Sequence, residues 1–495
     1  MSRDFGVVFG FLLLHLAYVT VGAAVMYVVG LLGEDRRPLA IVWAVGPAYL
    51  IGVAVTVCAG SALLTLGIPI HLWVLLLVSI AVVAGSVWLR RTDRVGRVAP
   101  ARLELRNRYE VVLLAVAAAA GAFYAVWAAV GFMNAPVGWD AAHVWSLRGV
   151  ALYHFETLEP RIFENPAFES LHLAYPVGQP LLEATSYRSW GHVDVRLWHV
   201  ELWLFWVGAV WSIAYLVAAR TGRLAVAVAI PMIALVTPAA VAPVELAYAD
   251  ITAAAFFGVG ALCLGLCIDD RRPGWALLAG LLLAAGANVK NEGLAYAAVA
   301  LAVAAVVLLA RYGFRRALVS FGWAAVPFAV LVAPWRIWLR INGPFPGDQR
   351  PILDSLDWGF LTDRWFRVQI SVRTLITDFL EPQWALLVPL FVAAAILCLV
   401  VGHRRALTGY YLAAVIGGFA SLIWVYWTGY PPDVALNLNG TAWRVPAGMV
   451  LAAAAGLTHL VASLHADTAR ALTGGGEDPG STAGTTRRRS ESRRR

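Results

Sequence analysis

The stretch ITAAAFFGVGALCLGLCI at residues 251–268 carries no charged side chain over its whole length. A helix needs about 20 predominantly apolar residues to cross the hydrocarbon core of a bilayer. After a short turn that contains Arg271 and Arg272, a second apolar stretch, WALLAGLLLAAGAN, follows at residues 275–288. Lipid offers the polypeptide backbone no hydrogen-bond partner, so the two stretches indicate two transmembrane helices.

Similar apolar stretches recur along all but the last part of the chain. Of its 495 residues, 60% are hydrophobic and 14% are charged, and the mean hydropathy is +0.72. A soluble domain has roughly 45–50% apolar and about 25% charged residues, so a soluble enzyme, a disordered chain and a disulfide scaffold are excluded. We expect an all-α fold, a polytopic transmembrane helical bundle of about 13 spans. These spans are at residues 5–32, 39–66, 68–89, 111–133, 197–219, 224–243, 251–268, 275–288, 293–310, 317–334, 384–401, 407–428 and 445–464.

The formal net charge of +8 does not indicate a nucleic-acid partner. The arginines lie in short loops between apolar stretches, which is the pattern that orients membrane proteins. The four cysteines lie inside apolar stretches without the spacing of metal ligands, and we expect them to be small core residues: Cys58, Cys263, Cys267 and Cys398.

The arginine distribution also predicts an orientation. Seven arginines fall within Arg90–Arg108, and cytoplasmic loops are the ones that collect basic residues. We therefore expect a multi-pass protein of the inner (cytoplasmic) membrane, with its amino terminus outside and its carboxyl terminus inside. Three parts are predicted: three extra amino-terminal helices and a basic loop (1–110), a transmembrane core (111–464) and a disordered basic cytoplasmic tail (465–495).

Two long outer segments, 134–196 and 335–383, mix aromatic residues, prolines and charges. Such segments are typical of helices that lie at the membrane interface, and we expect these at Trp145–Tyr153 and Trp358–Phe379. The 275–288 stretch is short for a span, so it should depend on its flanks or on burial in the bundle.

Ionisable residues concentrate on the outer side under this orientation, whereas the inner turns contain only arginine-rich stop signals. Charged groups at membrane depth are costly and usually functional, so the asymmetry predicts an outward-facing site. Its candidate members are Asp140, Glu245, Asp250, Lys290, Glu292 and Arg444.

Asp140 directly follows a predicted span, and Trp139 and Trp145 would hold it near the headgroups. His143 comes three residues later, so on a helix it would share a face with Asp140 and could bind substrate beside it. A carboxylate here suits a general base for an acceptor hydroxyl or a ligand for a divalent cation. Alternatively, Asp140 caps the helix that follows, a role compatible with the first.

The other acids and Lys290 also have two interpretations each. Glu245 and Asp250 could support the site or hold a metal ion, and Asp250 is also well placed to cap the next helix. Lys290 is the one lysine of the chain and suits a phosphate oxygen. The alternative is that Lys290 pairs with Glu292 or another acid only to neutralise a buried charge.

Arg444 opens the last predicted span on the outer side, against the usual distribution of basic residues. Arginines in this position can clamp a phosphate with two hydrogen bonds. Arg336 and Arg340 break the pattern in the same way, although for these two we favour contact with lipid headgroups.

Five motifs occur in the order expected of one enzyme group. The first is Trp139-Asp140 with Trp145, Arg148 and Ala151-Leu152-Tyr153. The others are Tyr175-Pro176-x-x-x-Pro180-Leu181-Leu182, Tyr248-Ala249-Asp250, Lys290-Asn291-Glu292-Gly293 and Asn437-Leu438-x-Gly440-Thr441-x-x-Arg444. In this order the motifs resemble those of the bacterial GT-C-type membrane glycosyltransferases, the broad relatives of protein mannosyltransferases and lipid A aminoarabinose transferases. The resemblance covers about residues 111–464.

The resemblance implies a GT-C-like core that moves a hexosyl or pentosyl group from a polyprenyl-phosphate-linked donor to an extracytoplasmic acceptor, which is a glycan, lipid or protein hydroxyl. Asp140 matches the family's base or metal-binding acid, and Arg148 stands where many relatives have a lysine that could meet the donor phosphate. Tyr175 and Asn291 lie in the matching motifs as candidate substrate-binding residues. Several members have two adjacent acids where this chain has Asp140-Ala141, so a divalent cation as cofactor stays an open question.

Two other functions remain as alternatives. One is a lipid or glycolipid transporter or flippase, for which Pro231, Pro238 and Pro243 give a hint of a broken helix. The other is a non-catalytic membrane assembly subunit, which would need neither clustered acids nor a lone lysine.

Overall fold

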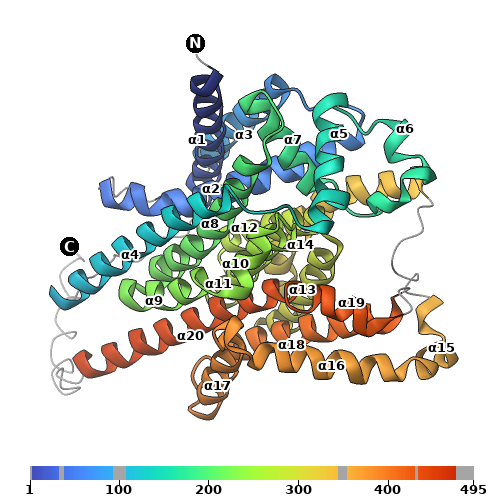
Figure 1. The fold of residues 1–495 in the computed structure, drawn as a ribbon. Coiled ribbons are helices and arrows are strands. Elements are labelled where there is room, and N and C mark those ends of the chain that lie inside the picture. Colours follow the sequence, from blue (N-terminus) through green and yellow to red (C-terminus); the bar gives the residue numbers. More distant parts are fainter. Residues whose placement is uncertain (1–2, 33–37, 93–107, 344–353, 430–432, 475–495) are drawn as a thin grey trace, which may run out of the picture.

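The computed structural model describes residues 3–32, 38–92, 108–343, 354–429 and 433–474, and the elements in these ranges are all helical (Figure 1). Ten of the described helices are long and apolar enough to cross a membrane. They are α1 (Arg3–Val29), α2 (Pro38–Thr65), α3 (Leu72–Thr92), α4 (Arg108–Phe132), α8 (Val195–Thr221), α11 (Asp250–Asp270), α13 (Asn291–Tyr312), α14 (Phe314–Asn342), α18 (Arg405–Thr428) and α20 (Ala447–Gly474).

Shorter helices connect or flank these ten. They are η1 (Ala141–Ser146), α5 (Leu147–Phe155), α6 (Pro160–Phe163), η2 (Pro166–Leu171), α7 (Gly178–Trp190), α9 (Leu224–Leu235), α10 (Pro238–Glu245), α12 (Pro273–Val289), η3 (Asp354–Leu356), α15 (Trp358–Asp363), α16 (Trp365–Leu380), η4 (Pro382–Trp384), α17 (Leu387–Val400) and α19 (Val434–Thr441).

The prediction of about 13 spans is too high for the part of the chain that is described, where ten or eleven helical segments pass as spans. The segment at 224–243 is broken into α9 and α10, which meet at 53°. Thr237 is extended there and Pro238 opens the second helix, so the helix cannot continue through this point.

Two further predicted spans correspond to helices that are shorter than expected. α17 begins only at Leu387, because Ala385 and Leu386 have positive φ angles of 51° and 52° and separate it from η4. α12 is also short, but nearly all of its residues are buried inside the bundle. Its burial agrees with the expectation for the 275–288 stretch.

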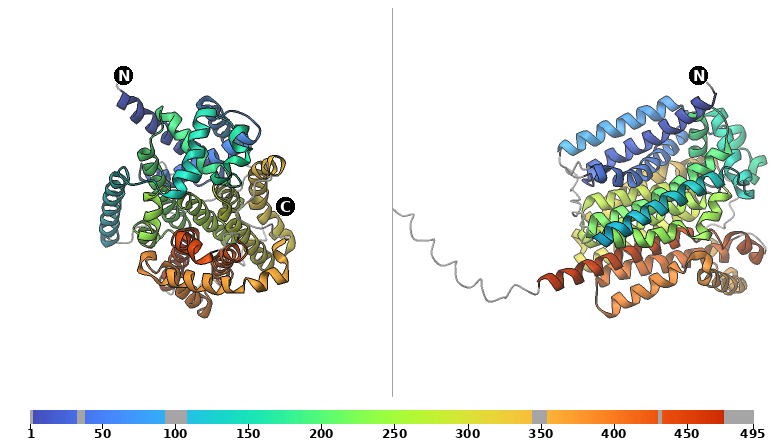
Figure 2. Two further views of the ribbon diagram at one scale, coloured as in Figure 1. Left: turned by 45° about the vertical axis from the view of Figure 1, so that its right-hand side comes forward. Right: turned by 60° about the vertical axis from the view of Figure 1, so that its left-hand side comes forward.

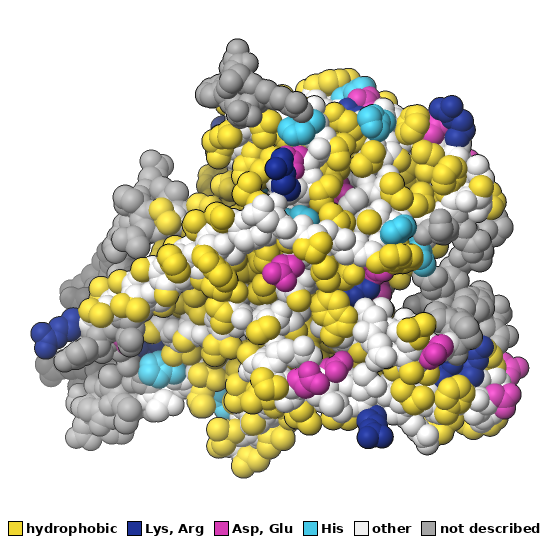
Figure 3. Space-filling model, in the orientation of Figure 1, with side chains coloured by type: hydrophobic (Ala, Val, Ile, Leu, Met, Phe, Trp, Pro, Cys, Tyr) yellow, Lys and Arg dark blue, Asp and Glu magenta, His cyan; other side chains and the backbone are white. Residues whose placement is uncertain are grey.

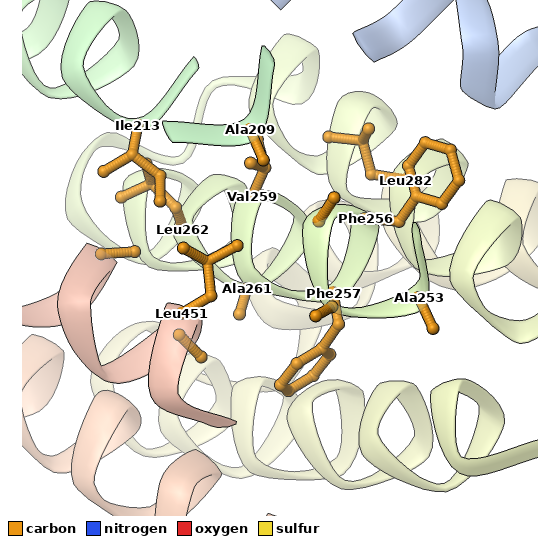
Figure 4. Packing of buried hydrophobic residues seen from close by; sticks show 14 of the residues in the cluster. Ala209, Ile213, Ala253, Phe256, Phe257, Val259, Ala261, Leu262, Leu282 and Leu451 are labelled. Atoms are coloured by element: carbon orange, nitrogen blue, oxygen red, sulfur yellow. The ribbon is translucent and has the colours of Figure 1, made fainter. Parts of the chain in front are cut away.

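The core of the bundle is built around α11, whose whole membrane-length window is buried. Side chains from α8, α12 and α20 pack around it, as Figure 4 shows for Ile213, Leu282 and Leu451. Many of its positions are Ala or Gly, which let neighbouring helices approach closely. In a membrane this close van der Waals packing supplies much of the association energy, because lipid is as apolar as the side chains.

The amino-terminal helices are integrated with the rest of the chain. α1 packs on α2 and α7, and α2 packs on α8, α12 and α14. Within the described ranges, α1 and α2 are therefore part of the packed bundle and not a separate layer at its edge. At the other terminus, α20 continues to Gly474, so the predicted start of the tail at residue 465 falls inside a helix.

The long helices run side by side, and the two ends of the bundle differ (Figure 2). One end, here called the outer end, carries η1, α5, α6 and α7 together with the start of α1. α20 finishes at the opposite, inner end. Helices are present in both segments that were predicted to lie at the interface: η1 and α5 cover the first, and α15 and α16, separated by Arg364, cover the second.

The inner end holds more than arginine stop signals, which corrects the sequence-based expectation. Asp269 accepts hydrogen bonds from Arg220 at 3.0 Å and from Arg404 at 2.6 Å, and Arg404 also lies 3.3 Å from Asp467. These ion pairs join α8, α11, the start of α18 and α20.

Hydrophobic side chains cover most of the face of the molecule in Figure 3. Histidine and charged side chains lie over the end that carries α5 and α7, and further charged side chains are scattered over the lower part of this face (Figure 3). This is the surface of a multi-pass membrane protein, apolar along the helices and polar at the helix ends.

Candidate functional site

The first outer loop places Asp140 against a turn that is distant in sequence. The backbone N–H of Gly138 donates to the carbonyl of Leu246 at 3.0 Å. A Cβ atom at position 138 would come within 2.6 Å of the Tyr248 ring, so only glycine allows this approach. The contact brings Asp140 next to the turn that leads into α11.

Asp140 stands before η1, a π-helix that covers Ala141–Ser146. Its side chain makes no capping hydrogen bond to that helix. The carboxylate Oδ2 forms a short ion pair with Arg444 Nη2 instead. Single π-turns inside helical segments are often found at functional sites.

Arg444 joins two carboxylates from different parts of the chain. Besides Asp140, its Nη1 lies 2.5 Å from Asp250 Oδ2, and its Nε donates to the carbonyl of Gly440 at 3.2 Å. The guanidinium also lies over the Tyr248 ring at 4.2 Å. Burial alone would lower the pKa of Arg444, but Asp250 and then Asp140 outweigh burial and raise that pKa above its usual value.

Asp250 links Arg444 to Lys290 through its two carboxylate oxygens. Its other oxygen, Oδ1, accepts a hydrogen bond from Lys290 Nζ at 2.6 Å, and the same Nζ lies 3.4 Å from Glu292 Oε1. No capping hydrogen bond from a side chain marks the start of α11, so the predicted capping role of Asp250 is replaced by these two ion pairs.

The backbone around Lys290 explains how it reaches Asp250. Lys290 is extended, with φ −149° and ψ 148°, and separates α12 from α13. A Cβ atom at Gly293 would lie 2.3 Å from the carbonyl oxygen of Gly286. Glycine at 293 therefore lets the two helices turn back tightly on each other, and Lys290 points from this turn into the bundle.

Five residues thus form one line of alternating charge, here called the charge chain: Asp140, Arg444, Asp250, Lys290 and Glu292. Three carboxylates face two cations, which gives a formal net charge of −1. The central members Asp250, Arg444 and Lys290 have side chains only 2–7% exposed, whereas Asp140 is 30% exposed. The chain therefore runs from a solvent-accessible acid into a buried interior.

Arg336 of α14 lies beside this chain and was not expected there. Its Nη1 donates to Asn291 Oδ1 at 3.0 Å and its Nη2 donates to the carbonyl of Ala287 at 3.4 Å. Arg336 is half-buried, with a buried Nε atom that has no partner among the described residues. Its sequence position had favoured a lipid contact, because hydropathy alone does not show which neighbour a helix end faces.

Arg148 and Tyr175 belong to a different part of the outer end. Arg148 is completely buried, and its Nη2 donates to the carbonyls of Tyr175 at 2.7 Å and Pro176 at 3.3 Å. The Tyr175 ring packs edge-on against Trp145, with ring centroids 5.4 Å apart. This burial leaves the guanidinium no exposed face, so the structure gives Arg148 a supporting position beneath the outer loop.

His143 and Glu245 also lie apart from the charge chain. His143 is exposed, stacks on Trp139 with centroids 4.6 Å apart and places Nδ1 2.9 Å from the Trp139 carbonyl oxygen. The wider turn of the π-helix changes the i+3 relationship that an α-helix would give to Asp140 and His143. Glu245 is exposed at the end of α10, and its electrostatic neighbours are Tyr124 and His199.

Metal binding was predicted as a possibility for Asp140 and Glu245. Within the ranges that the structure describes, no three His, Cys, Asp or Glu side chains are close enough to hold a metal ion. Asp140 has a guanidinium against its carboxylate, and Glu245 does not belong to the charge chain. These donors do not fit a divalent cation.

A second group of buried charges, at Glu183 and Glu201, was not singled out by the sequence patterns. Both side chains are completely buried, Tyr187 donates to Glu183 at 3.4 Å, and Ser186 donates to Glu201. Gln179 lies one turn before Glu183 on α7, equally buried and without a partner for either amide atom in the described residues. Glu201 could have been recognised from the sequence, because it is an acid inside the predicted 197–219 span and such residues are usually functional or paired.

Glu183 makes the stability of the protein depend on pH. Burial, and to a smaller extent Glu201, raises the pKa of Glu183 from 4.5 to about 8, although Ser146, Tyr187 and Arg148 oppose the rise. Between these two values the unfolded chain binds fewer protons than the folded one, so stability falls as pH rises through this window. We expect Glu183→Gln, which imitates the protonated acid, to flatten the decline of the unfolding temperature between pH 5 and 8.

Thermal unfolding of the purified full chain across a pH series measures this effect. Glu164→Gln, at an exposed position after α6, is the matched control and should keep the slope of the original protein. An unchanged slope in Glu183→Gln would contradict the assignment.

All four cysteines lie in the described ranges, buried and not in disulfides, as expected.

Comparison of the chain with protein-family models, with curated proteins and with solved structures gave no match.

Proposed function

We propose that this protein is a GT-C-type membrane glycosyltransferase that moves a sugar from a polyprenyl-phosphate-linked donor to an extracytoplasmic acceptor hydroxyl. The observation that supports it is the charge chain. Segments near residues 140, 250, 290 and 444 contribute to it, and its first member, Asp140, directly precedes η1 at the outer end of the bundle. A donor that carries a polyprenyl chain stays in the bilayer, so its phosphate must be met by cations at this depth.

Asp140 is the proposed general base. It is the most exposed member of the charge chain and stands at its end, where an acceptor hydroxyl can approach. Its carboxylate takes the hydroxyl proton while the acceptor oxygen attacks the anomeric carbon. The bond from that carbon to the phosphate breaks, and polyprenyl phosphate leaves with the electron pair. Because this is a single direct displacement, the anomeric configuration is inverted.

Arg444, Lys290 and Arg336 are the proposed partners of the leaving phosphate. Arg444 and Lys290 are fixed in place by Asp250, the carboxylate between them, so they need little rearrangement when negative charge develops. The charge chain alone has an excess of one carboxylate, and Arg336 balances it. Glu292 Oε2 is buried without a hydrogen-bond partner among the described residues, which suits it to accept a hydrogen bond from a sugar hydroxyl.

A lipid or glycolipid transporter is the second candidate, and the break between α9 and α10 favours it. Transporters often contain broken helices near the membrane midplane, with polar groups at the break. Here the residues around the break are Val236, Thr237 and Pro238, none of them ionisable. The charge chain lies away from this break, which favours the transferase over both the transporter and an assembly subunit.

The proposed orientation is testable by cysteine labelling in intact cells, since the four native cysteines are buried. Glu245→Cys, at the end of α10, should react with a membrane-impermeant maleimide. Arg405→Cys, at the start of α18, should react only after the membrane is opened. Reaction of both positions in intact cells, or of Arg405→Cys alone, would overturn the orientation.

The proposed activity is tested in membranes that contain the full chain and receive polyprenyl-phosphate sugars labelled in the sugar. We expect label to leave the lipid fraction and to appear in an acceptor fraction, because the protein supplies both a base and phosphate partners. Membranes without the protein measure the background. Movement of intact labelled lipid between leaflets without sugar transfer would support the transporter, and neither event would support an assembly role.

A further inference from the structure

A separate pocket of about 630 Å³ opens at the outer end, where the turn between α2 and α3 meets the ends of α5 and α7. This volume lies within the range of about 300–1,000 Å³ that is usual for small-molecule sites. None of its lining residues belongs to the charge chain. Its chemistry comes from six side chains: His71, Trp73, Tyr153, His154, Glu156 and Arg188.

A fixed carboxylate anchors the pocket. Glu156 forms a short ion pair with Arg188, and its second oxygen lies 2.6 Å from His71 Nδ1. The backbone of Glu156 has a positive φ of 65°, and its carbonyl accepts a hydrogen bond from the N–H of Ile70 at 2.9 Å. Glu156 is the left-handed C-cap of α5, and its N–H donates to the carbonyl of Leu152 at 2.9 Å, so the position of the carboxylate is set by the end of that helix.

Aromatic rings form the other part of the lining. Trp73 is 61% exposed and stacks on His71 with centroids 5.8 Å apart. The guanidinium of Arg188 lies 5.6 Å from the centre of the Tyr153 ring, and His154 is exposed beside it. The pocket thus offers flat apolar faces beside groups that both donate and accept hydrogen bonds.

The charges in the pocket select the kind of ligand. Glu156 and Arg188 cancel, so the site has no excess positive charge for a phosphate and no excess negative charge for a cation. A neutral sugar has the matching surface, because its ring presents an apolar face of C–H groups and a rim of hydroxyls. Pockets with aromatic walls and a few placed polar groups bind ligands of this mixed character.

The position of the pocket relative to Asp140 indicates a chain of sugars. η1 and α5 follow each other without a gap, so the path from Asp140 to Tyr153 is roughly 20 Å at the rise of a helix. One sugar unit cannot occupy both places, but an extended oligosaccharide can reach from the pocket to the base.

We propose that this pocket binds a neutral oligosaccharide, the remote part of the acceptor glycan. The role as acceptor site rests on the proposed transferase function, whereas the binding of the oligosaccharide does not. The turn before α3 contributes His71 and the first turn of α3 contributes Trp73, which gives this amino-terminal part of the chain a role in substrate recognition.

Binding to the full chain in nanodiscs tests the proposal. The probes are four fluorescently labelled neutral hexasaccharides, built of glucose, mannose, galactose or arabinose, and the readout is fluorescence anisotropy. At least one should bind, and Trp73→Ala should weaken it at least tenfold. Trp358→Ala removes another exposed outer tryptophan, 77% exposed on α15, and should change binding less than twofold.

Three results would overturn the site. These are binding of none of the four probes, equal weakening by Trp73→Ala and Trp358→Ala, or displacement of the probe by short-chain phosphatidylethanolamine, which would assign the pocket to lipid. Failure of the proposed function has a different signature. The hexasaccharide would then bind in a Trp73-dependent manner, while membranes with labelled donor show no transfer to it.

Discussion

Replacing Asp140 with Asn is expected to reduce sugar transfer by at least a hundredfold while the protein stays folded. Positioned general bases typically contribute about 10²–10⁴-fold to a rate, and Asn keeps the shape of Asp but cannot take a proton. The carboxylate is 30% exposed, so removal of its charge should cost less stability than the same change at a buried acid. Initial rates with labelled polyprenyl-phosphate sugar measure the effect.

Asp363→Asn is the matched control for this experiment, because Asp363 is an exposed aspartate at the end of α15. It should transfer sugar at the original rate. Size-exclusion profiles and unfolding temperatures of both variants separate loss of activity from loss of fold. If folded Asp140→Asn transfers sugar at the normal rate, the base assignment is wrong, and Glu292 with its buried, unpartnered Oε2 becomes the next candidate.

Much of the architecture follows from hydropathy. The ten long helices all fall in predicted spans, because each backbone segment in lipid must satisfy its own hydrogen bonds. The errors lie where local geometry interrupts an apolar stretch. Hydropathy does not register the bend at Pro238 or the left-handed residues before Leu387, since both occur among apolar side chains.

The candidate site was predictable in depth but not in lateral position. Charge and hydropathy indicate how far along the membrane normal a residue lies, and all candidates were assigned to one end on that basis. Only tertiary packing decides which of them meet in the membrane plane. Asp250 and Lys290 are brought together, whereas Glu245 is five residues from Asp250 yet lies outside the charge chain.

The π-helix and the acids of α7 and α8 show a second limit. No residue in Ala141–Ser146 requires a π-turn, so an α-helical spacing was the natural expectation. Glu201 was hidden within an otherwise apolar span, and Glu183 in a polar segment where an acid is not conspicuous. Their burial depends on α1, α2 and α5 packing around them, which sequence spacing does not reveal.

Asp250→Asn should destabilise the fold more than any other single change in the charge chain. Asp250 is 2% exposed and forms ion pairs with Lys290 at 2.6 Å and with Arg444 at 2.5 Å. Removing the shared partner leaves two neighbouring cations that only the peripheral acids balance. Breaking a buried ion pair in this way costs about 3–5 kcal/mol. A clear fall of the unfolding temperature in detergent, with Asp363→Asn unchanged, is the expected result.

A double variant identifies the cause of this loss. If the two cations repel each other once Asp250 is neutral, Asp250→Asn combined with Lys290→Met should be more stable than Asp250→Asn alone. If the double variant instead loses as much stability as Asp250→Asn and Lys290→Met lose together when each is made alone, the two residues do not interact. Recovery of stability together with a further fall of transfer below that of Asp250→Asn alone is the outcome that assigns Lys290 a role in the reaction, because a lysine present only to neutralise Asp250 is dispensable once that acid is gone.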